Sequence, residues 1–141
     1  MIEPTAIPPR EAPSAPQPHT PLRWCAVAAW AAVIFAMSSL HGSQIPGRFG
    51  NEAHVLEYVV LGSLVVHALL ASLDVTRAAW IAIVACWIYA FSDEWHQAFV
   101  PGRVPDIMDW TLDAIGVGIG IAVTLLVLDA IARRRSRRDS C

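Results

Sequence analysis

The stretch from Trp110 to Arg138 reads WTLDAIGVGIGIAVTLLVLDAIARRRSRR, and it indicates the fold class before any other part of the chain. Its apolar part, Trp110 to Ala132, is long enough as a helix to cross a hydrocarbon core of about 30 Å at about 1.5 Å per residue. Five arginines follow within residues 133–138, as is typical of a segment that stays in the cytoplasm and is attracted to anionic lipid. The stretch therefore predicts a membrane-spanning helix with a polybasic cytoplasmic end.

Three further apolar runs have the same character, so the sequence predicts an all-α integral membrane protein with four transmembrane helices. The last of the three is short, and we expect its helix to continue toward Val100, because Pro101-Gly102 then stops it. A cleaved signal peptide is the competing interpretation of the first run. The runs are Trp24–Leu40, Val55–Leu73 and Ala78–Ser92.

The overall composition agrees with a membrane protein. Of the 141 residues 55% are hydrophobic and only 16% are charged, and the mean hydropathy is +0.48. A formal net charge of −2 excludes a basic nucleic-acid-binding protein. The three cysteines are too scattered for a disulfide framework or for a CxxC redox or zinc motif; they are Cys25, Cys86 and Cys141.

The chain divides into three predicted parts. Residues 1–21 hold seven of the ten prolines and no apolar periodicity, which predicts a disordered cytoplasmic tail. Residues 22–132 form the four-helix transmembrane domain, and residues 133–141 form a polybasic cytoplasmic tail. Four spans place both termini on one side, and a cytoplasmic assignment of that side puts eight of the ten arginines inside. We therefore expect a multi-pass protein of the cytoplasmic membrane.

Polar residues gather at the opposite ends of these helices, on the extracytoplasmic side. Residues three and four apart share a helix face, and three such sets occur here, each on a different helix. Ionisable groups avoid lipid, so the three faces predict one shared polar pocket, with an arginine from the following loop placed over it. A guanidinium suits a carboxylate or a phosphate. The predicted ligand-binding residues are His54, Glu57, Tyr58, Asp93, Glu94, His96, Gln97, Arg103, Asp109 and Asp113.

Structural interpretations of these residues compete with the functional ones. Arg103 is more simply explained by an ion pair with a neighbouring acid than by substrate binding, Glu57 by a position near the headgroups, and His54 by capping of its helix. Gly116 and Gly120 have the small-xxx-small spacing that lets membrane helices approach closely, and no strand precedes them as in a nucleotide-binding loop. The acids that the sequence offers as ion-pair partners of Arg103 are Asp93, Glu94 and Asp109.

One longer motif and two shorter ones carry a family resemblance. The longer motif is Tyr89-x3-Asp93-Glu94-x-His96-Gln97-x-Phe99-Val100-Pro101-Gly102-Arg103-x5-Asp109-x3-Asp113-x2-Gly116. The shorter ones are Phe35-x2-Ser38-Ser39 and His54-x2-Glu57-Tyr58-x2-Leu61. Together they span roughly Trp24 to Ile131, and they resemble the VanZ-like family of small bacterial membrane proteins. The resemblance implies a role in the cell envelope related to resistance to the glycopeptide antibiotic teicoplanin, and it implies the site residues named above except His96.

Three functions are compatible with this pattern. The first is a protein that binds or modulates a lipid-linked or lipid-anchored envelope molecule, because an acidic pocket with an arginine lies where such molecules reside. The alternative is a membrane-embedded hydrolase or transferase acting on a lipid-linked substrate, with Asp93, Glu94 and His54 as catalytic candidates, because paired carboxylates in a partly desolvated site can divide into an acid and a base. The third is an ion- or proton-coupled transporter, which is disfavoured because the ionisable residues crowd one end.

The expected partners and cofactors follow from the same pattern. Membrane lipid is an expected partner, and a lipid-linked envelope molecule is the expected ligand. Nucleic acid is not expected as a partner, and the sequence leaves the oligomeric state open. We expect no cofactor, although acids and histidines of this kind also suit a divalent metal ion.

Overall fold

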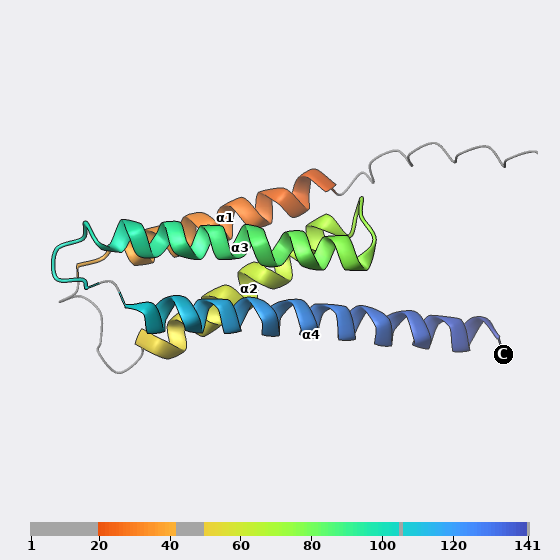
Figure 1. Cartoon of the computed structure of the whole chain (residues 1–141). Helices are drawn as coiled ribbons and strands as arrows, with labels where there is room; N and C mark the ends of the chain where they lie inside the picture. The colour runs from red at the N-terminus through yellow and green to blue at the C-terminus, as the bar shows by residue number, and fades with distance from the viewer. Residues whose placement is uncertain (1–19, 42–49, 105, 141) are drawn as a thin grey trace, which may run out of the picture.

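Four α-helices run up and down beside one another (Figure 1). The computed structural model describes residues 20–41, 50–104 and 106–140, and these contain no strand. The last turns of α1 and α3 and the first turns of α2 and α4 meet at one end of the bundle, which we call the polar end. The start of α1, the α2–α3 turn and the end of α4 lie at the other (Figure 1). The helices are α1 (Thr20–Ser38), α2 (Gly50–Leu69), α3 (Val75–Gln97) and α4 (Ile107–Asp139).

Aspartate caps and a proline–glycine turn set the boundaries of α3 and α4. The Asp74 side chain accepts a hydrogen bond from the Arg77 amide at 3.0 Å, and Asp106 accepts one from the Met108 amide at 2.8 Å. Gly102 has a φ of 80°, a left-handed conformation that costs glycine little. The α3 helix ends somewhat before the predicted Val100, because the chain already turns there with a 3.0 Å hydrogen bond from the Val100 amide to the Gln97 carbonyl.

Two glycines of α4 bring it into close contact with α2. A Cβ atom on Gly116 would lie 2.5 Å from the Val55 carbonyl oxygen, and one on Gly120 would overlap the Val59 carbonyl. A Cβ atom on Gly118, by contrast, would meet nothing within 4 Å. The predicted packing role of Gly116 and Gly120 is therefore confirmed.

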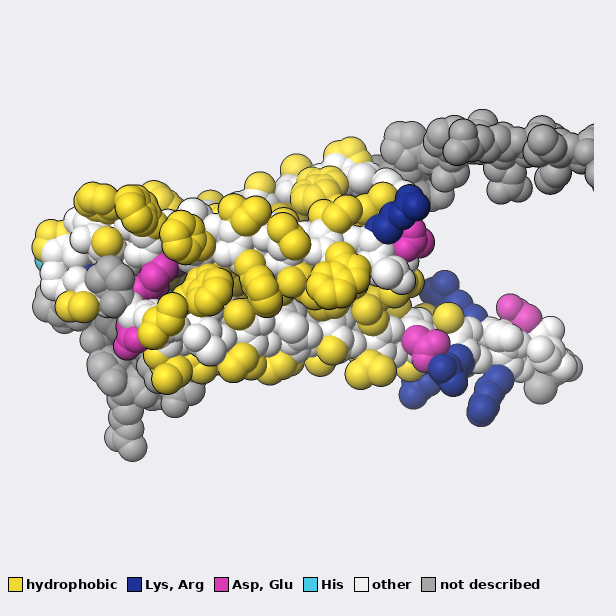
Figure 2. All heavy atoms as spheres, in the orientation of Figure 1, with side chains coloured by type: hydrophobic (Ala, Val, Ile, Leu, Met, Phe, Trp, Pro, Cys, Tyr) yellow, Lys and Arg dark blue, Asp and Glu magenta, His cyan; other side chains and the backbone are white. Residues whose placement is uncertain are grey.

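Apolar side chains cover the middle of the molecule (Figure 2). Trp80, Ile88 and Leu126 are each more than 60% exposed, which suits a surface that faces lipid rather than water. The helices α1, α3 and α4 are long and apolar enough to cross a membrane, while the apolar segment of α2, Ala53–Leu69, is shorter. The all-helical fold is confirmed, and a fourth span through α2 stays a prediction.

Two of the helices extend beyond their apolar runs at the end of the bundle opposite the polar end. The α1 helix begins at Thr20, so that Pro21 belongs to its first turn, where proline is tolerated. The rest of the predicted proline-rich tail, residues 1–19, lies outside the described residues. The α4 helix continues through its arginines, and Arg133 pairs with Asp129 at 2.7 Å. The arginines of α4 gather at this end of the molecule (Figure 2).

The α2 helix begins earlier than its apolar run. It starts at Gly50 rather than at Val55, so His54 lies inside the helix. The prediction that His54 caps the helix is therefore wrong, since its side chain is directed across to α4 instead.

Candidate functional site

A buried histidine–aspartate pair joins α2 to α4 at the polar end. The His54 Nδ1 and Asp113 Oδ1 atoms are 3.0 Å apart, and only 8% of His54 and 1% of Asp113 are exposed. Asp109, one turn earlier on α4, has its Oδ2 atom 3.8 Å from His54 Nε2. Because a carboxylate is costly to bury without a partner, the imidazole is what allows Asp113 to lie in the interior. The structure thus brings these three predicted residues together.

Asp93 and Gln97 form a second contact on the inner face of α3. Gln97 Nε2 donates a hydrogen bond to Asp93 Oδ2 at 3.1 Å, and both residues are buried. The side-chain oxygen Gln97 Oε1 in turn accepts a hydrogen bond from Arg103 Nη1 at 3.4 Å. Arg103 is therefore connected to Asp93 through an amide group rather than directly.

Arg103 fastens the α3–α4 loop to the end of α1. Its Nη2 atom donates to the Met37 carbonyl at 3.2 Å and its Nε atom to the Leu40 carbonyl at 3.4 Å. Carbonyl groups at a helix C-terminus lack intrahelical partners and carry the negative end of the dipole, which a guanidinium complements. Among the described residues no carboxylate lies within 4 Å of Arg103. The predicted ion pair with Asp93, Glu94 or Asp109 is wrong, because these carbonyls and Gln97 take up the guanidinium.

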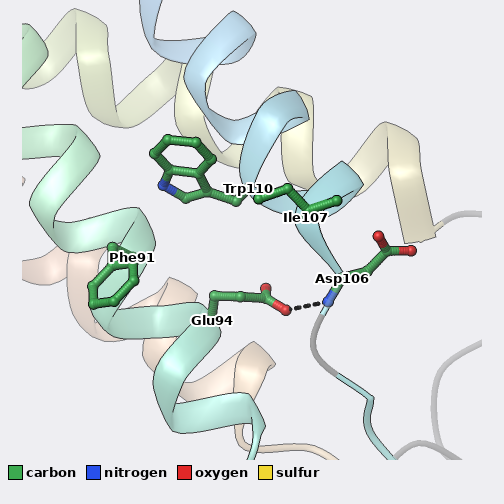
Figure 3. A pocket seen from close by; sticks show the side chains of 5 residues that line it. All are labelled: Phe91, Glu94, Asp106, Ile107 and Trp110. Atoms are coloured by element: carbon green, nitrogen blue, oxygen red, sulfur yellow. Dashed lines mark hydrogen bonds between the residues drawn. The ribbon is translucent and has the colours of Figure 1, made fainter.

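Asp93 and Glu94 are neighbours in sequence but have different partners. Glu94 Oε1 accepts a hydrogen bond from the Asp106 backbone amide at 2.6 Å (Figure 3), whereas Asp93 is bonded to Gln97. His54 is hydrogen-bonded to neither of them. The three catalytic candidates therefore lie at separate positions in the polar end and share no hydrogen bond. Glu94 nevertheless interacts electrostatically with both Asp93 and His54.

His96 lies toward the outside of the bundle, against the last turn of α1. Its Nε2 atom is 3.0 Å from the Ser39 hydroxyl oxygen, and its ring stacks on Phe35 with centroids 4.6 Å apart. Asp93 and Gln97 on the same helix are buried, whereas His96 is only half-buried. His96 therefore contacts α1 rather than the interior polar groups.

Glu57 and Tyr58 of α2 occupy the interior between these contacts. Glu57 is half-buried and interacts electrostatically with His54, Asp93, Asp113 and Arg103. Glu57 therefore faces these protein groups. The sequence had suggested a position near the lipid headgroups instead. Tyr58 is fully buried beside the carboxylates of Asp93 and Asp113.

Four buried polar atoms at the polar end have no hydrogen-bond partner in the described residues. Asp93 Oδ1 is one of them, since the adjacent Ser38 hydroxyl donates to the Phe35 carbonyl. Buried polar groups in proteins are nearly always hydrogen-bonded, so these atoms indicate a place for water or a ligand. The four atoms are Tyr58 Oη, Asp93 Oδ1, Glu94 Oε2 and Trp110 Nε1.

Sequence reasoning missed two of the residues that shape this region. Asp106 holds Glu94 through its backbone amide, and Trp110 contributes one of the unpartnered atoms. The position of Asp106 just before an apolar run is typical of a helix cap and offered a signal for it. In the sequence Trp110 is the first residue of the last apolar run, so nothing in the pattern marked its indole as a polar group of the site.

No described residues form a metal centre. Within residues 20–41, 50–104 and 106–140, no group of three histidine, cysteine, aspartate or glutamate side chains is arranged to hold a metal ion. Cys25 and Cys86 are both free thiols.

Three helices that are long and apolar enough to cross a membrane, with a polar cluster at one end of the bundle, support a membrane protein. The sequence model of the VanZ/LLP1 family matches residues 13–128, and the chain belongs to that family. The resemblance found in the sequence motifs is thereby confirmed. No curated protein and no solved structure matches the chain.

Proposed function

We propose that this protein acts in the cell envelope by binding the polar part of a lipid-linked or lipid-anchored molecule at its polar end. The observation that carries the proposal is the set of four buried polar atoms at the polar end that have no hydrogen-bond partner among the described residues. Each such atom costs about 1–3 kcal/mol when it lacks a hydrogen bond. A polar group that reaches any of these atoms from the membrane surface would supply its missing hydrogen bond.

The charge distribution supports an extracytoplasmic position for this end. The arginines of α4 lie at the opposite end of the molecule (Figure 2). Arg23, near the start of α1, and Arg77, near the start of α3, lie at that same end. Arginine-rich ends remain in the cytoplasm. The polar end is then in the leaflet where envelope precursors and membrane-anchored antibiotics reside.

A role in tolerance of glycopeptides such as teicoplanin follows from the family resemblance and from this geometry. Teicoplanin is itself amphiphilic, with an acyl tail, so it combines the polar and apolar parts that such a site would meet. We therefore propose a teicoplanin-resistance-like role for the protein.

Two tyrosines provide a matched test of this proposal. The Tyr58 hydroxyl is buried and has no hydrogen-bond partner among the described residues, so Tyr58→Phe removes no hydrogen bond within them and deletes a hydroxyl that a ligand reaching the interior would bond. Tyr89 donates to the Ala31 carbonyl at 2.6 Å, so Tyr89→Phe weakens the bundle without changing an unpartnered group. Bacteria that carry each variant are tested against a panel of membrane-anchored envelope antibiotics, with protein levels measured in parallel. We expect Tyr58→Phe to change sensitivity at an unchanged protein level; unchanged sensitivity across the panel would contradict the proposal.

A hydrolase or transferase acting on a lipid-linked substrate is the second candidate, and the His54–Asp113 pair favours it. A carboxylate that orients an imidazole is a common arrangement for a general base. Asp93 and Glu94 remain the candidate acids. Purified protein is incubated with lipid-linked envelope precursors, and its metal content is measured. Turnover lost in His54→Gln, or a stoichiometric metal lost in Asp93→Asn, would favour this candidate over a binding protein.

A further inference from the structure

A cavity of about 200 Å³ lies between α1, α2 and α3, in the half of the bundle away from the polar end. Its floor is formed by Leu61, Val65 and Cys86, which are all buried. Its rim is formed by Trp24 of α1 and Ile81 of α3, which are 43% and 47% exposed. The cavity therefore opens sideways, onto the apolar surface that suits lipid.

The chemistry of the lining favours hydrocarbon as the occupant. The Tyr89 hydroxyl at the inner end is occupied, because it donates to the Ala31 carbonyl at 2.6 Å, and the buried thiol of Cys86 behaves as a small apolar group. An ordered water molecule needs several polar partners, which the floor of the cavity does not offer. Pockets that enclose a whole ligand measure about 300–1,000 Å³, so this smaller cavity has room for part of one hydrocarbon chain.

A guanidinium lies at the end of this cavity that is farthest from the polar end. Arg23 directly precedes Trp24 of the rim, and its Nη1 atom donates to the His67 carbonyl at 3.0 Å, two residues before Leu69 of the lining. Arg23 is half-buried, and in the part of the chain that the structure describes no carboxylate lies within 4 Å of it. A guanidinium has five N–H donors, so Arg23 can also bind an anion at the mouth of the cavity.

A second arginine lies at the same level on α3. Arg77 is one turn before Ile81 of the rim and shares a helix face with it, and the starts of α1 and α3 lie at the same end of the bundle (Figure 1). Its ion pair with Asp74, at 3.3 Å, is exposed on both sides, and exposed pairs of this kind contribute little. Arg77 can therefore exchange the carboxylate for a phosphate, at the depth where the exposed indole of Trp80 suits the headgroup region.

We propose that the cavity and these two arginines form a binding site for one anionic phospholipid in the leaflet at this end of the bundle. One acyl chain lies in the cavity, and the phosphate accepts charge-assisted hydrogen bonds from Arg23 and Arg77. A lipid in this position packs α1 against α2 and α3. The site is separate from the polar end and does not depend on the proposed function.

The experiment compares two headgroups on the intact protein. The full-length chain in detergent is titrated with phosphatidylglycerol and phosphatidylcholine that carry the same acyl chains, and binding is measured by native mass spectrometry. Both lipids have the phosphate, but the choline group adds a positive charge beside the two guanidinium groups. We expect the glycerol lipid to bind about ten-fold more tightly.

Three charge-neutralising variants locate the headgroup. Arg23→Gln and Arg77→Gln should each remove most of the preference for the glycerol lipid. The Arg77 side chain is 76% exposed, so its replacement does not disturb the packing of the helices. Arg134→Gln neutralises an exposed arginine near the end of α4 and should leave the preference unchanged.

A pair of larger side chains locates the acyl chain. Ala85 lines the cavity and is exposed, so Ala85→Leu fills the opening without crowding the buried core. We expect this variant to bind both lipids about ten-fold more weakly while it keeps the preference for the glycerol lipid. Ala122→Leu makes the same change on the exposed face of α4 and should leave both affinities unchanged. Far-ultraviolet circular dichroism shows that each variant is helical before binding is compared.

Equal affinities for the two lipids, or a preference that survives in either Arg23→Gln or Arg77→Gln, would overturn the assignment. A preference lost in Arg134→Gln would also overturn it, since the headgroup would then bind the arginines of α4. Unchanged affinities in Ala85→Leu would show that the acyl chain lies outside the cavity, with the same consequence. None of these results bears on the proposed function, because neither Tyr58 nor Asp93 lines this cavity.

Discussion

Replacing Gly116 by alanine tests how the close contact between α2 and α4 assembles the polar end. Gly116 lies almost one turn after Asp113 and packs on the α2 backbone one residue beyond His54. Gly118 on the same helix is the matched control, because it undergoes the same chemical change with nothing within 4 Å of the added methyl group. The difference between the two variants therefore isolates the helix contact.

The distances set the size of the expected effect. The added methyl of Gly116→Ala would lie 2.5 Å from the Val55 carbonyl oxygen, whereas ordinary van der Waals contact begins at 3.4 Å, so α4 must move away from α2. A shift of that size stretches the 3.0 Å contact between His54 and Asp113 beyond hydrogen-bond length. Overpacking costs about 1–3 kcal/mol and the weakened charged hydrogen bond about 1.5–3 kcal/mol, while the better helix propensity of alanine offsets about 1 kcal/mol. We expect a net loss of about 2–4 kcal/mol in the free energy of unfolding.

The assay is equilibrium unfolding in mixed micelles as the fraction of dodecyl sulfate increases, followed by far-ultraviolet circular dichroism. Gly118→Ala should leave the free energy of unfolding unchanged or raise it by up to about 1 kcal/mol, because only helix propensity changes. The reasoning is refuted if the two variants differ by less than about 0.5 kcal/mol, which is the usual range for a surface substitution.

Three further predictions concern single contacts. His54→Ala should destabilise the protein by about 3–5 kcal/mol, because it leaves Asp113 buried without a partner; adding Asp113→Asn should recover much of that loss in the same unfolding assay. Arg103→Lys should cost about 1–2 kcal/mol and speed hydrogen exchange in the α3–α4 loop, because one ammonium cannot reach both the α1 carbonyls and Gln97. Asp106→Ala should lower the free energy of unfolding by about 1 kcal/mol while Asp106→Asn lowers it less, and equal losses would show that the side chain does not cap α4.

The sequence allowed the membrane helices and the shared polar end to be predicted, because both depend on patterns along single helices. Hydrophobic runs give the helices, and the three- and four-residue spacing placed Asp109 and Asp113 together on one face of α4. Which partner each group takes is a property of packing between helices. His54 was expected to have a role at its own helix end, and only the approach of α2 to α4 shows that it pairs with Asp113.

Two features of the polar end have a physical explanation in the backbone. Arg103 binds carbonyl groups of α1, and backbone acceptors carry no residue type that a sequence pattern could mark. Acidic residues can be recognised in a sequence, so an ion pair between Arg103 and one of them was predicted. Asp93 and Glu94 were treated as a carboxylate pair, but adjacent residues on a helix with 3.6 residues per turn point in directions about 100° apart. Their separate partners follow from that geometry.

The polar residues of α2 lie on a helix that the other three helices enclose. Between Ala53 and Leu69 only Leu56 is exposed, since α1, α3 and α4 all pack against this helix. A helix that carries His54 and Glu57 would be costly if it faced lipid, and it is stable at that depth because protein surrounds it. The α2 helix therefore lies at the centre of the candidate site. The glycine contact with α4 keeps it there, so a change at Gly116 should alter the site even though Gly116 is not one of its polar groups.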